Sequence, residues 1–322
     1  MSVSRLAKVK TGRIDRPLRF VFYGVEGVGK SSVCAAAPSP IFLDLEDGSG
    51  HLDVPRYTWR DDDQGHMPAS YEEVKQAVRD LMDAKHDFST LIIDTADRLE
   101  PLIWQYMLDR DCKRTGKKLH SIEDYGYGKG YALAVDEWRA FCASLDMLRL
   151  KRGMNIILVA HSYVRLYKNP EGEDFDRYQL RVHDKAAGFL GEWCDVLGFC
   201  CFEEGVAKLE EGSRVKGYST GRRLCKLERT AAYNAKSRIP LPREVELEIG
   251  NPWKPLADAI ERSNNQLNPK ILIDLIGVEL KRIGDDALTD SVKKAIMQAE
   301  GKVQLLNVYL NNLQTREVTQ HA

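Results

Sequence analysis

Hydrophobic residues in the first two hundred positions fall into short, nearly unbroken runs separated by longer segments with a helical period. The runs cover residues 20–23, 41–45, 90–94, 155–162 and 195–202. Runs of this length and apolar content are typical of strands that are buried on both faces of a parallel sheet. Between them, segments such as 71–84 carry apolar residues three and four positions apart, which predicts amphipathic helices.

This alternation of strand and helix predicts an α/β fold with a mostly parallel central sheet flanked by helices. Beyond about residue 200 the pattern changes, and 214–220, 222–229 and 243–249 read as antiparallel strands. A linker of sequence NPWKP follows, and the remainder is helical in pattern. We therefore expect an N-terminal arm at 1–16, a core at 17–250 and a small helical C-terminal region at 251–322.

The last helical segment carries an apolar stripe with spacings of three and four. Its members are Val292, Ile296, Ala299, Val303, Leu306, Leu310 and Leu313. Such a stripe favours packing within the C-terminal region, and a helix that binds a partner is the alternative.

Composition is that of a soluble globular protein, with 43% hydrophobic and 30% charged residues. No apolar run approaches the ~18 residues of a membrane span, and the N-terminus lacks the apolar core of a signal peptide. The seven cysteines show no metal-binding spacing, so we interpret them as reduced thiols. We expect a cytoplasmic protein that does not bind membranes.

Charge is unevenly distributed, although the net charge is only −1. Residues 44–100 are strongly acidic, whereas residues 214–243 hold nine Lys or Arg and the single acid Glu228. The basic stretch forms either a solvated face or a surface for the phosphates of a nucleotide or nucleic acid.

The sequence GVEGVGKSS follows the first apolar run and precedes a helical segment. It matches the P-loop pattern G-x-x-x-x-G-K-[ST] in the strand–loop–helix context that the pattern requires. Backbone N–H groups of such a loop hold phosphates, and its lysine reaches the β- and γ-phosphates. We therefore expect ATP to be bound by Gly24, Val25, Glu26, Gly27, Val28, Gly29, Lys30, Ser31 and Ser32.

The run at 90–94 ends in Asp94, as expected of a Walker B strand. Ligands bind at the carboxyl ends of parallel strands, so Asp94 and the Ser31 hydroxyl are the expected Mg²⁺ ligands. Hydrolysis also needs a carboxylate that orients water. Asp44, Glu46 and Asp47 follow the second strand, and their spacing alone does not separate Glu46 from Asp47.

The order of these parts resembles the ATPase core of RecA-type recombinases, especially the compact phage-encoded single-strand annealing proteins, over about residues 16–248. FLDLEDGSGHLD resembles the strand whose glutamate activates water, which favours Glu46. LIIDTADRLE is similar to the Walker B strand of the family. NIILVAHS resembles the strand whose terminal polar residue senses the γ-phosphate, and here that residue is His161.

AKSRIPLP resembles the family's loop in which two cations reach the ATP of the neighbouring subunit. Lys236 and Arg238 occupy those places, and their alternation puts both side chains on one side of an extended segment. The resemblance thus implies trans-acting catalytic cations and a homo-oligomeric ring or filament. Surface cations without this role are the alternative.

In this family two loops hold single-stranded DNA, and the matching segments here are 116–131 and 163–184. They offer aromatic side chains for stacking and cations for phosphates, although the second also carries acidic residues. A loop without a nucleic-acid role is the alternative for each. The expected DNA contacts are Lys129, Tyr131, Arg165, Lys168, Arg177 and Arg181.

These features together predict an oligomeric, phage-encoded RecA-like ATPase that binds single-stranded DNA and promotes annealing or strand exchange. The C-terminal region is a candidate site for a single-strand-binding protein. Two alternatives remain: a helicase- or loader-type motor with the same core, and a regulatory P-loop ATPase that acts on protein partners.

Overall fold

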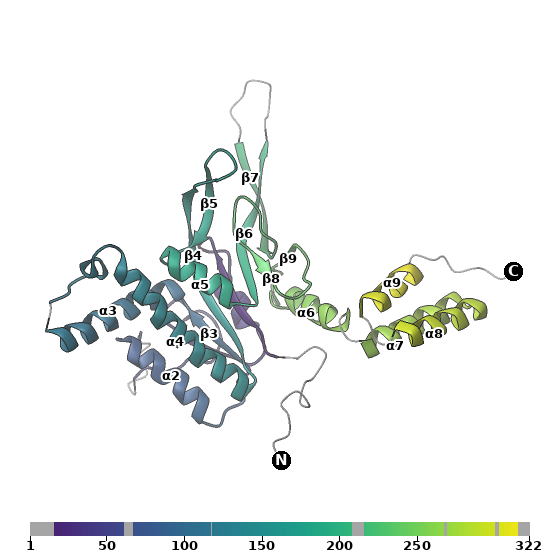
Figure 1. Cartoon of the computed structure of the whole chain (residues 1–322), viewed down its shortest axis with the longest axis horizontal. Helices are drawn as coiled ribbons and strands as arrows, with labels where there is room; N and C mark the ends of the chain where they lie inside the picture. Colours follow the sequence, from purple (N-terminus) through teal and green to yellow (C-terminus); the bar gives the residue numbers. More distant parts are fainter. Residues whose placement is uncertain are drawn as a thin grey trace, which may run out of the picture. The chain divides into compact units, whose positions relative to one another are not determined.

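The computed structural model describes residues 16–60, 67–116, 118–207, 216–266, 269–299 and 303–314 (Figure 1). The chain divides into two compact units: one runs to Arg238 and includes Arg243–Trp253, and the other contains Ile239–Pro242 and the chain from Lys254 onward. The arm expected at 1–16 lies outside the described residues except for Arg16. The expected boundaries at 16 and 250 stay a prediction.

A parallel sheet forms the centre of the first unit, and β1 (Arg19–Gly24) lies in its middle. It pairs in parallel with β4 (Asn155–Tyr167) on one side and with β6 (Val196–Ala207) on the other. Beyond β4 lie β3 (Thr90–Asp94) and β2 (Pro40–Asp44), which are also parallel. The predicted α/β class is confirmed, and the carboxyl ends of these strands meet at one edge.

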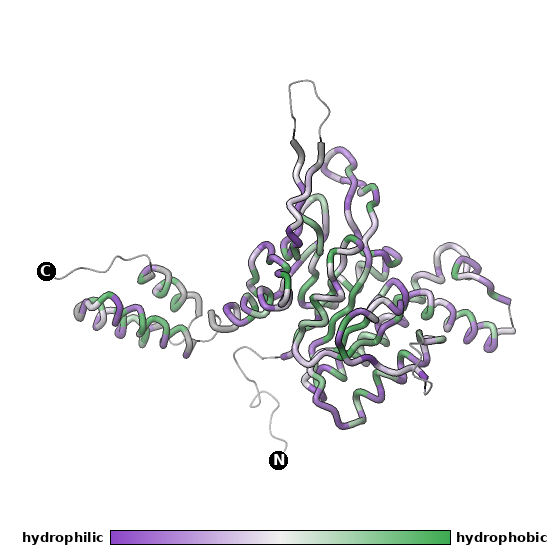
Figure 2. The backbone as a smooth tube through the Cα atoms, turned by 180° about the vertical axis from the view of Figure 1, so that it is seen from behind, coloured by the Kyte–Doolittle hydropathy of each residue, from purple (hydrophilic) through white to green (hydrophobic). Residues whose placement is uncertain are grey.

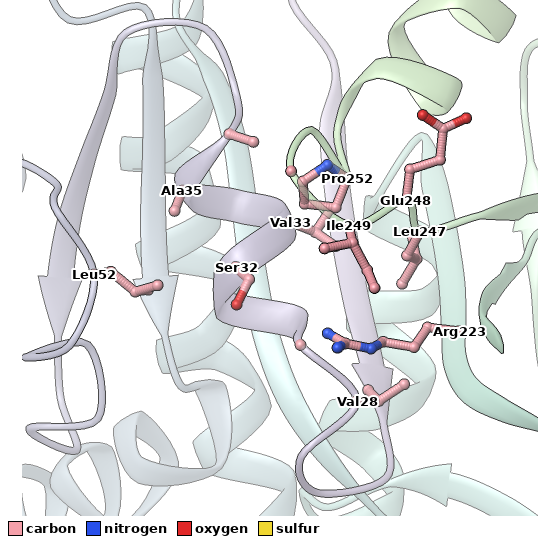
Figure 3. Close-up of a pocket in the computed structure, with 13 residues that line it drawn as sticks. Val28, Ser32, Val33, Ala35, Leu52, Arg223, Leu247, Glu248, Ile249 and Pro252 are labelled. Atoms are coloured by element: carbon pink, nitrogen blue, oxygen red, sulfur yellow. The ribbon is translucent and has the colours of Figure 1, made fainter. Parts of the chain in front are cut away.

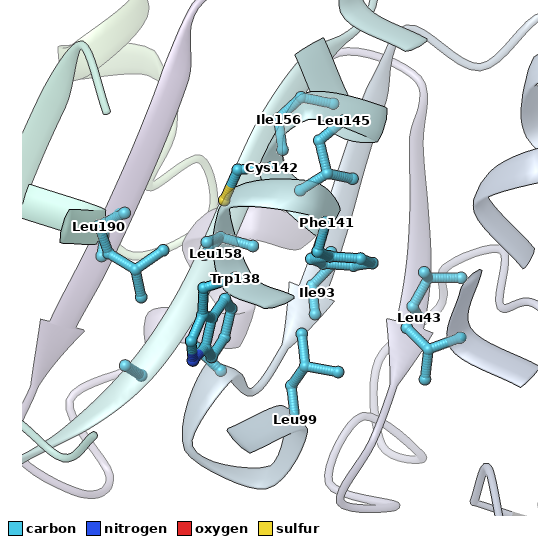
Figure 4. Packing of buried hydrophobic residues seen from close by; sticks show 14 of the residues in the cluster. Leu43, Ile93, Leu99, Trp138, Phe141, Cys142, Leu145, Ile156, Leu158 and Leu190 are labelled. Atoms are coloured by element: carbon cyan, nitrogen blue, oxygen red, sulfur yellow. The ribbon is translucent and has the colours of Figure 1, made fainter. Parts of the chain in front are cut away.

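Four helices cover one face of this sheet: α2 (Tyr71–Asp83), α3 (Ala96–Thr115), α4 (Lys129–Arg152) and α5 (Asp184–Trp193). Helix α4 contributes large apolar side chains to that layer. Trp138 and Phe141 lie beside Ile93 of β3 and Leu158 of β4 in a fully buried cluster (Figure 4). Hydrophobic residues accordingly concentrate in the central strands (Figure 2).

The opposite face carries the alternate residues of the same strands. Phe20 and Phe22 of β1 pack edge-on against Trp253, with ring centroids 5.5 and 6.4 Å away. Because successive strand residues point to opposite faces, an unbroken apolar run fills both layers at once. This is the physical reason why β1 could be predicted from its sequence.

The sheet continues beyond β6 with antiparallel strands: β7 (Lys216–Lys226), β8 (Lys236–Ser237) and β9 (Glu244–Glu246). β5 (Phe175–Leu180) pairs with the distal half of β4, so the expected loop at 163–184 is largely a β-hairpin. The loop prediction was wrong because this segment is rich in charged residues and lacks the apolar run that marks a buried strand. Arg177 and Leu180 are buried while their neighbours are not.

The other expected loop, at 116–131, is also partly regular. It contains the short helix η2 (Ile122–Tyr125), and its last three residues already belong to α4, which begins at Lys129. The glycines of this segment suggested an irregular loop. Instead, Ser121 and Asp124 form a capping box that stabilises the start of η2.

The second unit consists of four helices in the described residues: α6 (Lys254–Gln266), α7 (Pro269–Ile283), α8 (Asp286–Ala299) and α9 (Val303–Gln314). Val292, Leu306, Leu310 and Leu313 of the predicted stripe are buried with Leu272 and other residues of α7. These side chains therefore pack within the unit, as expected. Among the described residues, no helix is long and apolar enough to span a membrane.

Candidate nucleotide site

The register of the parallel strands gathers the predicted site residues at one edge of the sheet. Gly24 at the end of β1 lies beside His161 of β4 and Cys200 of β6. Asp44 at the end of β2 lies beside Asp94 at the end of β3. Residues from four segments that are far apart in sequence thus surround the loop between β1 and α1 (Lys30–Ala35).

The P-loop begins where β1 meets β6 at close range. A Cβ atom at Gly24 would lie 1.9 Å from the carbonyl oxygen of Cys200, so only glycine fits there. The Lys30 ammonium lies inside the loop and donates to the carbonyl oxygens of Gly24 and Val25 at 3.1 and 2.9 Å. Lys30 is only 7% exposed, and burial lowers its pKa.

Ser31 and Asp94 provide the donor set expected of a magnesium site. The Ser31 hydroxyl donates to Asp94 Oδ2 at 2.6 Å. Burial raises the pKa of Asp94 to about 6, and the hydrogen bond from Ser31 opposes that rise only in part. A hydroxyl and a carboxylate beside a phosphate-binding loop fit Mg²⁺, which would neutralise phosphate charge when bound there.

The three candidate carboxylates after β2 have different environments. Asp44 accepts hydrogen bonds from the backbone N–H groups of Glu46, Gly48 and Ser49, so it stabilises the turn. Asp47 is exposed. Glu46 lines the cavity beside the P-loop, and its Oε1 accepts a hydrogen bond from the Thr95 hydroxyl at 2.6 Å.

His161 lines the same cavity and is held by Asp97 of α3. Asp97 Oδ1 accepts from the His161 backbone N–H, and Oδ2 lies 2.9 Å from the ring Nδ1. The hydrogen bond to Asp97 raises the pKa of His161 and outweighs the opposing effect of burial. Glu46 Oε1 lies 3.7 Å from the same ring nitrogen. Both carboxylates thus approach Nδ1 of the imidazole, and Nε2 lies outside the Asp97 contact.

The cavity that these groups enclose has a volume of 260 Å³. Lys30, Ser31, Glu46, Asp94 and His161, all named from the sequence, line it. Sequence reasoning missed four residues of this lining: Gly48, His51, Thr95 and Arg223. Arg223 lies in the basic stretch at 214–243, and that charge excess was the signal that could have found it.

A second cavity of 440 Å³ adjoins the first along α1 (Figure 3). Its lining is mainly apolar, and Gly29, Ser32 and Arg223 line both cavities. The apolar residues are Val28, Val33, Ala35, Ala36, Leu52, Leu247, Ile249 and Pro252. A polar cavity that continues into an apolar one matches the two ends of a nucleotide.

Lys236 and Arg238 lie away from this cavity and contact their own chain. The side chains of both donate to the carbonyl oxygen of Glu192 at the end of α5, so they do share one side of the segment. Arg238 Nη1 also lies 3.3 Å from Asp195 Oδ1. Lys236 pairs with Leu197, three residues before the Cys200 that adjoins Gly24, or about 10 Å along β6.

The residues expected to bind DNA are not equally accessible. Arg177 is 3% exposed, and its guanidinium donates to the carbonyl oxygens of Thr230 and Tyr233, so it is removed from the set. The Tyr131 ring stacks on His183 with centroids 3.9 Å apart, and its hydroxyl donates to Glu123.

The other cations expected to bind DNA are exposed. Arg165 and Lys168 pair with Asp184 and Asp174, respectively. Arg181 lies 3.8 Å from Glu26 of the P-loop. Lys129 is exposed at the start of α4. Lys129, Arg165, Lys168 and Arg181 therefore remain available at the surface.

The mostly parallel sheet, the P-loop at the end of its central strand and the Ser31–Asp94 pair define a P-loop protein of the α/β class. Within that class, a family profile described as the AAA domain matches residues 16–239, and the chain belongs to this family. A solved structure of the RadB recombinase aligns with 73% of this chain and 89% of its own, at 10% identity and a TM-score of 0.39. That likeness is too low to support an argument. No curated protein matches the chain.

Proposed function

We propose that the protein hydrolyses ATP to ADP and phosphate. The observation that carries this proposal is the single cavity in which the P-loop lysine, the Ser31–Asp94 pair, Glu46 and His161 meet. Lys30 and the loop N–H groups bind the phosphates, and Ser31 and Asp94 hold Mg²⁺.

Glu46 is the proposed general base. Its carboxylate orients a water toward the γ-phosphate and takes a proton from it, while the Thr95 hydroxyl fixes the side chain by hydrogen bonding. His161 is the proposed γ-phosphate sensor, because it lines the cavity close to Glu46 and has a ring nitrogen outside the Asp97 contact. Positioning and charge stabilisation dominate such phosphoryl transfer.

Substitutions in the loop and at the base test this activity. Lys30→Ala should lose nucleotide binding because the phosphate-binding cation is gone. Glu46→Gln should bind ATP and hydrolyse it at least about a hundredfold more slowly, since general bases typically contribute 10²–10⁴-fold. Asp47→Asn is the matched control, and steady-state phosphate release is the measurement. Wild-type hydrolysis by Glu46→Gln with a slow Asp47→Asn would contradict the assignment.

We further propose that the ATPase is coupled to single-stranded DNA in annealing or strand exchange by a homo-oligomer. The resemblance to phage recombinases supports this proposal, as do the exposed cations Lys129, Arg165, Lys168 and Arg181. Lys236 and Arg238 would complete the neighbour's site, which is consistent with their distance from their own P-loop. The C-terminal helices would then recruit a single-strand-binding protein.

Retention on single-stranded DNA, falling as salt rises, tests the DNA proposal. Absence of retention would favour a regulatory ATPase that acts on protein partners. ATP-dependent displacement of a duplex strand would instead favour a motor.

A further inference from the structure

Arg223 of β7 has a surplus of hydrogen-bond donors beside the P-loop. Its neighbour Arg222 forms ion pairs with Glu203 and Glu246. Within the described part of the chain, the Arg223 guanidinium has no hydrogen-bond or ion-pair partner, although the residue is half-buried. Adjacent strand residues point to opposite faces, so the two arginines serve different surfaces.

The position of Arg223 is fixed by its strand and by the loop that it touches. Its backbone pairs with Phe202 of β6, and its carbonyl oxygen accepts from the Leu247 N–H at 2.8 Å. A Cβ atom at Gly29 would lie 2.9 Å from Arg223 Nη1. The φ of +90° at Gly29 also favours glycine, so both the backbone and the guanidinium require a bare Cα there.

Arg223 lies where the two cavities of the site join. It lines the polar cavity of Lys30, Ser31 and Glu46 and also the apolar cavity beside α1. Figure 3 shows its side chain extending from β7 toward the start of α1, near Ser32. If the γ-phosphate lies by Lys30 and Glu46 and the nucleoside in the apolar cavity, the α-phosphate lies between them, at Arg223.

Partial burial of a charge without a partner costs free energy, and an anionic ligand would offset that cost. A guanidinium presents a planar fork of N–H donors that matches two phosphate oxygens. In the nucleotide-free protein, the Arg223 guanidinium therefore already lies where a phosphate could form an ion pair with it.

Given the nucleotide binding proposed above, we propose that Arg223 binds the α-phosphate of the nucleotide in cis, with the nucleoside in the adjoining apolar cavity. This contact exists with ADP as well as with ATP. It is thus distinct from the γ-phosphate contacts of His161 and from the trans role of Lys236 and Arg238.

Equilibrium binding of ADP and of a non-hydrolysable ATP analogue to the full chain tests this role. Arg223→Ala should raise both dissociation constants by a similar factor, about ten- to a hundredfold, as for loss of a charge-assisted contact. Arg223→Lys should recover part of the affinity, and Arg222→Ala, the matched control, should leave it unchanged. The melting temperature of nucleotide-free Arg223→Ala should not fall, because the side chain has no partner to lose.

Two outcomes would overturn the inference. Unchanged affinity in Arg223→Ala would remove Arg223 from the nucleotide site, and a loss confined to the ATP analogue would make it a γ-phosphate contact. The binding readout is independent of hydrolysis. A wild-type chain that binds nucleotide without hydrolysing it would therefore contradict the proposed ATPase and leave the Arg223 inference standing.

Discussion

At the scale of single residues, ionised Asp94 lowers the stability of the folded protein because its carboxylate is buried. Its carboxyl is 5% exposed, and burial raises its pKa to about 6. A carboxyl whose folded-state pKa exceeds its unfolded value makes folding less favourable as pH rises between the two values. In the nucleotide-free protein, ionisation of this carboxylate, which fits Mg²⁺, thus lowers the free energy of unfolding.

Replacement of Asp94 by Asn should expose this cost. The amide is neutral and can still accept from Ser31, so nucleotide-free Asp94→Asn should melt at a higher temperature than the wild type at pH 8. The difference should shrink as pH falls from about 6 to 4, where Asp94 becomes protonated. Thermal melts across this range are the measurement, and a variant less stable than the wild type at pH 8 would contradict the argument.

Asp97 acts on the site through His161. The hydrogen bond with His161 keeps the pKa of that imidazole raised, and the same bond helps to hold the pKa of Asp97 low against the effect of burial. A raised histidine pKa contributes stability that is present at low pH and lost as pH rises through the folded-state value.

Asp97→Asn should therefore lower the pKa of His161. The stability gap between wild type and variant should be wide near pH 5.5 and narrower at pH 8.5. NMR titration of the imidazole, together with thermal melts at both values, measures these effects. An unchanged His161 titration would show that Asp97 is not its main electrostatic partner.

At the scale of elements, α4 combines a side buried in the core with an exposed lysine near each end. Its buried side supplies Trp138 and Phe141 to the core, whereas Lys129 begins the helix at one end and Lys151 lies near the other. Both lysines are exposed. The helix therefore offers two similar cations about 33 Å apart along its axis.

This separation provides an internal control for the DNA proposal. Lys129→Ala should weaken binding to single-stranded DNA and reduce the slope of log affinity against log salt by about 0.7, the value for one phosphate contact. Lys151→Ala should change neither quantity. Fluorescence anisotropy at several salt concentrations measures both. Equal effects of the two substitutions would indicate nonspecific attraction rather than a DNA path past Lys129.

At the scale of the whole molecule, the question is whether one chain holds a complete active site. The P-loop, Glu46 and His161 lie at the carboxyl edge of the sheet, whereas Lys236 and Arg238 are held near the start of β6 by Glu192 and Asp195. A role for these cations in hydrolysis thus requires a second copy of the chain.

Mixing two inactive variants tests this requirement. Arg238→Ala retains its own P-loop and Glu46, and Glu46→Gln retains Arg238, so each alone should be nearly inactive. In a mixed oligomer some interfaces would join an intact Glu46 to an intact Arg238, and ATP hydrolysis should reappear. Native mass spectrometry would verify co-assembly, and Arg243→Ala serves as the control for loss of an exposed arginine. Co-assembly without recovered activity would contradict the shared site.

The sequence alone determined the α/β class, the P-loop and Asp94, because these depend on local signals. Buried parallel strands need unbroken apolar runs, and a phosphate-binding loop needs glycines and a lysine at fixed spacing. Glu46 and His161 were named with the help of a family resemblance. The β-hairpin at 163–184 escaped because its strands are rich in charged residues and lack an apolar run. The burial of Arg177 escaped because it depends on the carbonyl groups of Thr230 and Tyr233, which are distant in sequence.

Only the tertiary structure decided which side chains share a cavity. Strand register brings His161 beside Gly24, and an antiparallel strand nearly two hundred residues after the P-loop places Arg223 against Gly29. The pairing of Asp97 with His161 likewise depends on how α3 lies against β4. Such contacts arise from packing between distant segments, and no local pattern encodes them. The fold therefore brings into one cavity side chains that are far apart in the sequence.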